Sequence, residues 1–118
     1  MSAATRNIFI VGAKRTPFGG FGGSLKNQST TDLATHASKA AIAHAGINPS
    51  KIDETFFGNV IQSSLDACYL ARHVALRAET PMNNPSMTIN RLCGSGFETV
   101  CMAAESIQLG RANAVLAG

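Results

Sequence analysis

The stretch that decides the fold is Ser86-Met-Thr-Ile-Asn-Arg-Leu-Cys-Gly-Ser-Gly-Phe97. The run over residues 87–92 alternates in polarity and is partly β-branched, which is typical of a strand. Cys93 follows it, and the Gly-Ser-Gly after the cysteine is turn chemistry. Beyond the turn, apolar residues recur at helical spacing, namely Phe97, Val100, Cys101, Ala104 and Ile107. Cys93 is therefore predicted to lie where a strand ends and a helix begins.

A cysteine at the start of a helix is a candidate nucleophile. Free backbone N–H groups and the positive end of the helix dipole lie at such a position. Both lower the pKa of a thiol, and the thiolate is the reactive form. The alternative interpretation is a small buried core residue, which is the usual place of a free cysteine. Spacing alone leaves both interpretations open.

The rest of the chain alternates between predicted strands and predicted helices. The strands are expected over residues 7–12, 55–62, 86–92 and 114–118, and the helices over about 31–45, 69–78 and 95–109. Thr31 is expected to cap the first helix, Gly46 to close it and Gly110 to end the last. Asn48-Pro49 predicts a short helical turn, and residues 15–24 a glycine-rich loop. This alternation indicates an α/β fold built from βαβ units around a mixed or parallel sheet.

The segment Asn90-Arg-Leu-Cys-Gly-Ser-Gly-Phe97 resembles the nucleophile segment of the thiolases, which cleave or form 3-ketoacyl-CoA. Three other segments resemble the same family in the same order. They are Ile10-Val-Gly-Ala-Lys-Arg-Thr-Pro-Phe-Gly19, Gly58-Asn-Val-Ile-Gln62 and Tyr69-Leu-Ala-Arg-His-Val-Ala-Leu-Arg77. Within the family, the resemblance is greatest to the mitochondrial-type 3-ketoacyl-CoA thiolases. Four collinear segments make coincidence an unsatisfactory explanation.

The resemblance implies a fold, a reaction and a nucleophile. The fold would be a thiolase-like mixed sheet with helices on both faces, and residues 1–118 would form an incomplete N-terminal domain covering about the first third of a family chain. Cys93 would attack the 3-keto carbon and keep the shortened acyl group, while its backbone N–H helps to hold the oxyanion. Acyl-CoA and CoA would be substrates in fatty acid β-oxidation, with no permanently bound cofactor and no metal.

The resemblance also leaves alternatives open. Thiolases take their base and acid from a Gly-His-Pro segment and a Cys-x-Gly segment near the C-terminus, and this sequence contains neither. We therefore expect a fragment that is inactive alone. The rival enzyme is an acetoacetyl-CoA thiolase, and the rival from another class is a truncated, non-catalytic product. The Asn90 to Gly96 pattern argues against ketoacyl synthases, and acyl chain length is left undecided.

Composition excludes several other classes. The net charge of +3 is small and dispersed, which does not favour nucleic acid. Three cysteines provide neither a disulfide framework nor a metal pattern, and no apolar run approaches a membrane span.

The composition of the N-terminal segment bears on the compartment of the protein. The residues before Asp32 include several basic residues but no acidic one, and they are rich in Ser and Thr, like a mitochondrial transit segment. The mitochondrial matrix is thus the expected compartment, with the cytoplasm as the alternative.

The remaining candidate residues receive structural interpretations. His36 and His44 are expected at exposed or boundary positions, and His73 matches no family catalytic position. Cys101 is expected to pack on the apolar face of its helix, and Cys68 has no supported role. Glu98 suits the helix dipole and is expected to turn away from Cys93.

Assembly can also be predicted from the strand that leads into Cys93. In the family this strand is a sheet edge that pairs with its twin across a two-fold axis. Here it covers residues 86–92, and residues 86–90 carry no charge. An uncharged edge is an aggregation hazard unless it is covered, and a two-fold contact covers both copies at once. We therefore expect a homodimer or tetramer, with Met87, Thr88 and Ile89 near the axis.

Overall fold

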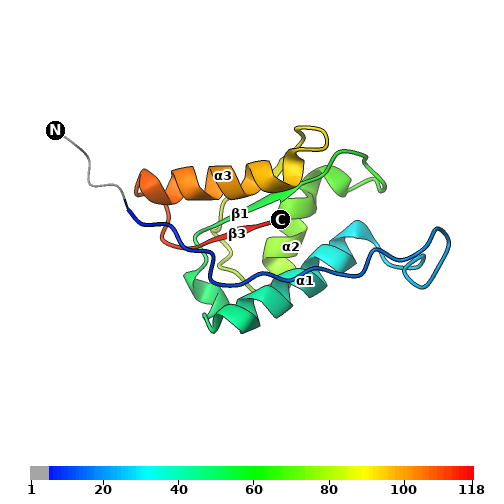
Figure 1. Ribbon diagram of the computed structural model, residues 1–118, viewed down its shortest axis with the longest axis horizontal. Helices are drawn as coiled ribbons and strands as arrows, with labels where there is room; N and C mark the ends of the chain where they lie inside the picture. The colour runs from blue at the N-terminus through cyan, green and yellow to red at the C-terminus, as the bar shows by residue number, and fades with distance from the viewer. Residues whose placement is uncertain (1–5) are drawn as a thin grey trace.

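A computed structural model describes residues 6–118 and contains a three-stranded parallel sheet (Figure 1). The strands are β1 (Glu54–Gly58), β2 (Ser86–Ile89) and β3 (Val115–Ala117), in the order β2-β1-β3. Phe57 of β1 is in register with Thr88 of β2, and Thr55 with Leu116 of β3. The strand that leads to Cys93 therefore lies at an edge of the sheet, as predicted.

Three helices cover the sheet: α1 (Thr30–Ala45), α2 (Leu70–Arg77) and α3 (Ser95–Gln108). In Figure 1, α3 lies on one side of the strands, while α2 lies on the other side with α1 packed against it. Two short 3₁₀ turns, η1 (Pro49–Lys51) and η2 (Ala67–Tyr69), complete the elements. The predicted α/β class with helices on both faces is confirmed. No helix among residues 6–118 is both long enough and apolar enough to cross a membrane.

The two faces of β1 follow from the alternation of its side chains. Phe57 points into the main hydrophobic core, whose other members are Ile42, Ile52, Leu70, Ala71, Val74, Ala78 and Leu116. Glu54 and Gly58 face α3 instead: the Glu54 carboxylate accepts a hydrogen bond from Ser106, and Gly58 lies against Ser95. Successive residues of a strand point to opposite faces, so β1 packs against α2 with one face and against α3 with the other.

The buried face of α3 differs from the one that its apolar spacing predicts. The buried residues are small and mostly polar: Ser95, Thr99, Ala103 and Ser106. Their small size lets the helix approach β1 and β3 closely. Of the apolar stripe, Phe97 is 64% and Val100 42% exposed, while Ala104 and Ile107 are half-buried and line a cavity together with Val100. Cys101 is exposed too, so its predicted packing was wrong.

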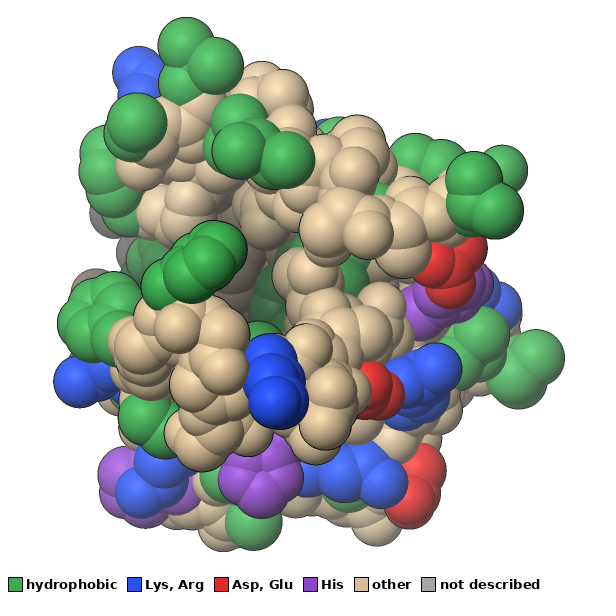
Figure 2. Space-filling view, turned by 90° about the vertical axis from the view of Figure 1, so that its right-hand side faces the viewer, with side chains coloured by type: hydrophobic (Ala, Val, Ile, Leu, Met, Phe, Trp, Pro, Cys, Tyr) green, Lys and Arg blue, Asp and Glu red, His purple; other side chains and the backbone are tan. Residues whose placement is uncertain are grey.

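Exposed apolar side chains recur elsewhere on the surface. On the face shown in Figure 2, hydrophobic side chains stand out over the upper half around a hollow, and most charged side chains gather lower down. Phe18, Phe21 and Leu65 are each more than nine-tenths exposed. Large apolar side chains therefore make up a visible part of this face.

Several predicted boundaries need correction. No strand forms over residues 7–12, and residues 8–12 line a cavity together with β3 instead of pairing with it. The second and third strands end earlier than predicted, at Gly58 and Ile89. The cap of α1 is Ser29, not Thr31, because Ser29 and Asp32 exchange hydrogen bonds in a capping box.

Other local predictions are confirmed. Gly46 ends α1 with a left-handed φ of 67°, and Gly110 follows α3 with φ of 74°. Asn48 caps η1 by accepting from the Ser50 N–H at 2.9 Å. Residues 15–24 form a loop.

Candidate active site

Cys93 lies in the turn that joins β2 to α3. The strand ends at Ile89, residues 90–94 form the turn, and α3 begins at Ser95 with Gly94 as its N-cap. The Cys93 side chain is exposed. The predicted junction is therefore confirmed, and the alternative of a buried core cysteine is excluded within the described chain. An exposed thiol beside the first turn of a 14-residue helix is accessible to a reagent or a substrate.

The turn holds an unusual backbone conformation. The Arg91 carbonyl accepts from the Gly94 N–H at 3.2 Å, so Leu92 and Cys93 occupy the two central positions. Leu92 has a φ of 50°, a left-handed conformation that costs about 1–2 kcal/mol for a residue with a side chain. Strained backbone of this kind persists only where surrounding contacts fix it, and it concentrates at functional sites.

Side chains on either side hold this turn. The Leu92 N–H donates to the Asn90 side-chain oxygen at 3.0 Å, and the Arg91 N–H donates to the Ser95 hydroxyl at 2.8 Å. The Arg91 side chain crosses over Gly94, where an added Cβ would lie 2.5 Å from its Nη1 atom. Sequence reasoning missed both Asn90 and Ser95 as supports. Their only signal was the short polar side chain, which is common in any turn.

Glu98 has a defined partner in the first turn of α3. Its carboxylate Oε2 lies 3.2 Å from Nε of Arg91. The Arg91 guanidinium therefore places a positive charge beside the Glu98 carboxylate, next to the turn that carries Cys93. The predicted orientation of Glu98 away from Cys93 stays a prediction.

The other candidate residues lie apart from this arrangement. His36 and His44 are exposed on α1, which confirms their prediction. His73 of α2 lies 3.2 Å from the Asp66 carboxylate, and a hydrogen bond from Ser64 is the main cause that holds the pKa of Asp66 below its usual range. Cys68 is exposed in η2. Among residues 6–118, none of these groups forms a hydrogen bond or an ion pair with Cys93.

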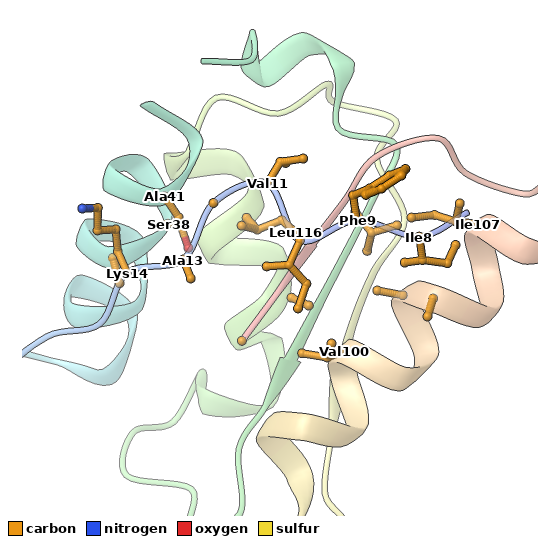
Figure 3. Close-up of a pocket in the computed structure, with 18 of the residues that line it drawn as sticks. Ile8, Phe9, Val11, Ala13, Lys14, Ser38, Ala41, Val100, Ile107 and Leu116 are labelled. Carbon is orange, nitrogen blue, oxygen red and sulfur yellow. The ribbon is translucent and has the colours of Figure 1, made fainter. Parts of the chain in front are cut away.

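A cavity beside the N-terminal segment does not include Cys93. It has a volume of about 350 Å³ and lies between the segment 8–14, α1, α3 and β3. Figure 3 shows Ile8, Phe9 and Val11 along this segment, with Val100 and Ile107 on α3 and Leu116 on β3. The lining is mostly apolar and contains no carboxylate and no cysteine; its polar side chains are Lys14 and Ser38, and the Ser38 hydroxyl donates to the Ala34 carbonyl of its own helix. Its chemistry suits packing rather than catalysis.

Comparison with known proteins places this arrangement in a family. The model of the thiolase N-terminal domain matches residues 8–118, which is nearly the whole chain. The chain belongs to the thiolase family, and it corresponds to the N-terminal domain of that family.

Relatives and solved structures agree with this assignment. The chain is 49% identical to the human mitochondrial 3-ketoacyl-CoA thiolase, over 98% of this chain and 29% of the relative. It is 42% identical to acetyl-CoA acetyltransferase 2 of Arabidopsis thaliana, over 99% of this chain and 29% of that protein. A crystal structure of the human mitochondrial thiolase in complex with CoA matches with a TM-score of 0.90 at 50% identity, covering 92% of this chain and 28% of that one. The acetyl-CoA acetyltransferase of Bacillus anthracis matches with a TM-score of 0.91 at 39% identity, covering 99% and 29%.

Proposed function

We propose that this chain is the nucleophile-bearing N-terminal part of a 3-ketoacyl-CoA thiolase. The observation that carries the proposal is the exposed Cys93 thiol in a strained turn at the start of α3. Membership in the thiolase family supports it. The chain spans about 29% of the length of the relatives above, so the activity belongs to the longer protein in which this domain would sit.

The proposed reaction transfers an acyl group through the Cys93 sulfur. The thiolate attacks the 3-keto carbon of the substrate and forms a carbon–sulfur bond. The bond between carbons 2 and 3 then breaks, and acetyl-CoA leaves as an enolate that takes up a proton. The thiol of a second CoA loses its proton, attacks the thioester and carries the shortened acyl group away. Covalent catalysis of this kind divides one difficult step into easier ones.

The backbone N–H of Cys93 is proposed as an oxyanion donor. In the described chain, Gly94 and Ser95 donate their N–H groups to the carbonyls of Arg91 and Leu92, while no hydrogen bond uses the N–H of Cys93. An unused donor at the start of a helix suits the negative charge that develops on the attacked carbonyl oxygen. The base and acid would come from the Gly-His-Pro and Cys-x-Gly segments, outside residues 1–118.

Substrates and location follow as parts of the same proposal. CoA and acyl-CoA would be the ligands, because a related thiolase was crystallised with CoA and the relatives carry CoA thioesters in their names. A place in the mitochondrial matrix, in fatty acid β-oxidation, is supported by several relatives named as mitochondrial. The first residues of a transit segment would fall partly outside the described residues.

A second candidate function is acetoacetyl-CoA thiolysis, which is supported by the identity to acetyl-CoA acetyltransferases. The discriminating measurement compares acetoacetyl-CoA with a long-chain 3-ketoacyl-CoA as substrates of the longer protein. Preference for the long chain favours the first proposal, and exclusive use of acetoacetyl-CoA favours the second. A parent sequence without the Gly-His-Pro and Cys-x-Gly segments would instead favour a non-catalytic product.

The nucleophile itself can be tested on this chain. Cys68, Cys93 and Cys101 are all exposed, so differences in labelling by iodoacetamide report reactivity rather than access. Limited labelling followed by peptide mapping should modify Cys93 first. Cys93→Ala should remove the fast phase, and Cys101→Ala should leave it. Preferential labelling of Cys68 or Cys101 would refute the assignment.

A further inference from the structure

Ser95 makes an unusual set of hydrogen bonds for the first residue of a helix. Its hydroxyl accepts from the Arg91 N–H at 2.8 Å and donates to the Leu92 carbonyl at 2.6 Å. Its backbone N–H donates to the same carbonyl at 3.0 Å. A serine at a helix start ordinarily bonds forward to the first N–H groups of the helix, whereas this hydroxyl bonds backward into the turn.

The carbonyl that Ser95 holds is covalently tied to Cys93. Leu92 C=O and Cys93 N–H belong to one peptide unit, and no peptide bond among the described residues is cis. A trans peptide is planar, with its C=O and N–H pointing in opposite directions. Two donors from Ser95 on the oxygen therefore fix the direction in which the Cys93 N–H points.

The sheet fixes Ser95 in turn. Its side chain is buried, with 4% relative exposure. Gly58, the last residue of β1, lies so close that an added Cβ would be 2.7 Å from the Ser95 Cβ and 2.9 Å from its carbonyl carbon. Burial keeps water from competing for the hydroxyl, and a hydrogen bond is stronger in such surroundings. Packing against β1 therefore fixes the place of Ser95, and the hydrogen bonds of Ser95 fix the peptide that joins Leu92 to Cys93.

We propose that Ser95 is a positioning residue of the acyl-transfer site, and that it acts by orienting the Cys93 N–H toward the oxyanion. This inference rests on the proposed function of Cys93. It predicts an effect on acyl transfer that is absent from reactions without an oxyanion, because an oriented donor contributes only where charge develops on oxygen. A purely structural serine would alter both kinds of reaction alike, through the fold.

Two reagents separate these possibilities on the 118-residue chain. p-Nitrophenyl acetate transfers its acetyl group to the Cys93 sulfur through a tetrahedral oxyanion, with p-nitrophenolate as leaving group. Iodoacetamide alkylates the same sulfur by displacement of iodide and forms no oxyanion. The measured quantity is the ratio of the acetylation rate to the alkylation rate at Cys93, obtained by peptide mapping.

Ser95→Ala removes the hydroxyl and adds no volume. It should lower the ratio by about tenfold or more, since loss of a whole oxyanion donor costs more than this. Thr99→Ala is the matched control: its hydroxyl is buried one turn further along α3 and bonds to the Gly96 and Gly118 carbonyls. That variant should leave the ratio unchanged. An unchanged ratio in folded Ser95→Ala would overturn the inference.

The outcomes distinguish failure of this inference from failure of the proposed function. If Cys93 reacts no faster than Cys68 and Cys101 in the unmodified chain, the proposed function fails. If Cys93 is selectively reactive and Ser95→Ala slows both reagents equally, only the role of Ser95 fails. If Ser95→Ala does not fold, amide hydrogen exchange of the unmodified chain provides the test. The inference requires that the Cys93 N–H be free to bind an oxyanion, so protection of this N–H equal to that of the Ser95 N–H would overturn it.

Discussion

Gly58 and Ser95 lie so close together that an added Cβ at Gly58 would come within 2.7 Å of the Ser95 Cβ. One residue ends the central strand and the other begins the helix that follows Cys93. Because the added atom would also meet backbone atoms of Ser95 and Gly96, flexible side chains cannot absorb the contact. The approach of β1 to the start of α3 thus requires glycine for its size.

Gly58→Ala should destabilise the fold by about 1–3 kcal/mol, as expected for an added methyl group in a well-packed site. Gly96→Ala provides a matched control, because an added Cβ there meets nothing within 4 Å. That control should stabilise by about 0.5 kcal/mol, since alanine restricts the unfolded chain. Urea unfolding measures both changes. Equal midpoints for Gly58→Ala and the unmodified chain would contradict the close packing.

Leu92→Gly should be more stable than the unmodified chain by about 0.5–1 kcal/mol, because relief of the left-handed conformation exceeds the entropic cost of glycine. Leu109→Gly is the control, since Leu109 is equally exposed but has a φ of −76°. It should be less stable by about 0.5–1 kcal/mol. Thermal unfolding compares the two. A loss of stability in both variants would show that the Leu92 backbone is not strained.

Asp32 should make folding stability depend on acid pH. Hydrogen bonds from the Ser29 side chain and backbone, followed by the Arg77 guanidinium, hold the pKa of this carboxyl below its usual range. Its contribution is therefore present above the unfolded pKa of about 3.9 and is lost as pH falls through the folded pKa. Asp32→Asn should flatten the acid limb of a stability profile measured by urea unfolding from neutral pH downward. An unchanged acid limb would contradict the role of this capping box.

Met87→Lys should weaken self-association through the β2 edge. Met87 is 47% exposed, and a lysine there would bring like charges together across a two-fold contact. Thr88 is a less suitable position, because it is half-buried and its hydroxyl accepts from the Ala71 N–H at 3.0 Å. Met82→Lys, in the loop before β2, is the control at a 75% exposed methionine. Light scattering that reports the same oligomer for all three proteins would exclude this edge as the interface.

The 118-residue chain alone should not catalyse thiolysis. It contains Cys93 but neither of the segments that would supply the base and acid, and proton transfer by such groups is needed for turnover. The assay follows the disappearance of acetoacetyl-CoA in the presence of CoA, with Cys93→Ala as the blank. Turnover above that blank would show that the chain supplies its own base.

The local features of the Cys93 junction could be predicted because they depend on neighbouring residues. Gly94 after the cysteine and the apolar spacing beyond it were sufficient to place a turn and a helix, and the structure confirms both. The support from Ser95 could not be predicted, because a serine between two glycines is equally typical of any exposed turn. Its role depends on Gly58, which is far away in sequence.

Strand formation over residues 7–12 was predicted wrongly for a related reason. A strand needs a neighbouring backbone to bond with, and the pattern Ile8-Phe-Ile-Val11 cannot show whether one is present. The buried face of α3 was predicted wrongly for the same reason. Helical spacing identifies an apolar stripe, but the face that packs against β1 is the one with small residues. Both errors concern the neighbour against which a helix or strand packs, and the sequence of the helix or strand itself does not identify that neighbour.

The exposed side chains of Phe97 and Val100 on α3 also bear on the lifetime of the protein in a cell. Chaperones and proteases recognise exposed apolar surface as a mark of incomplete folding, and such recognition sets steady-state abundance. With Phe97 and Val100 open to solvent, we expect this chain to be retained or degraded when it is made alone.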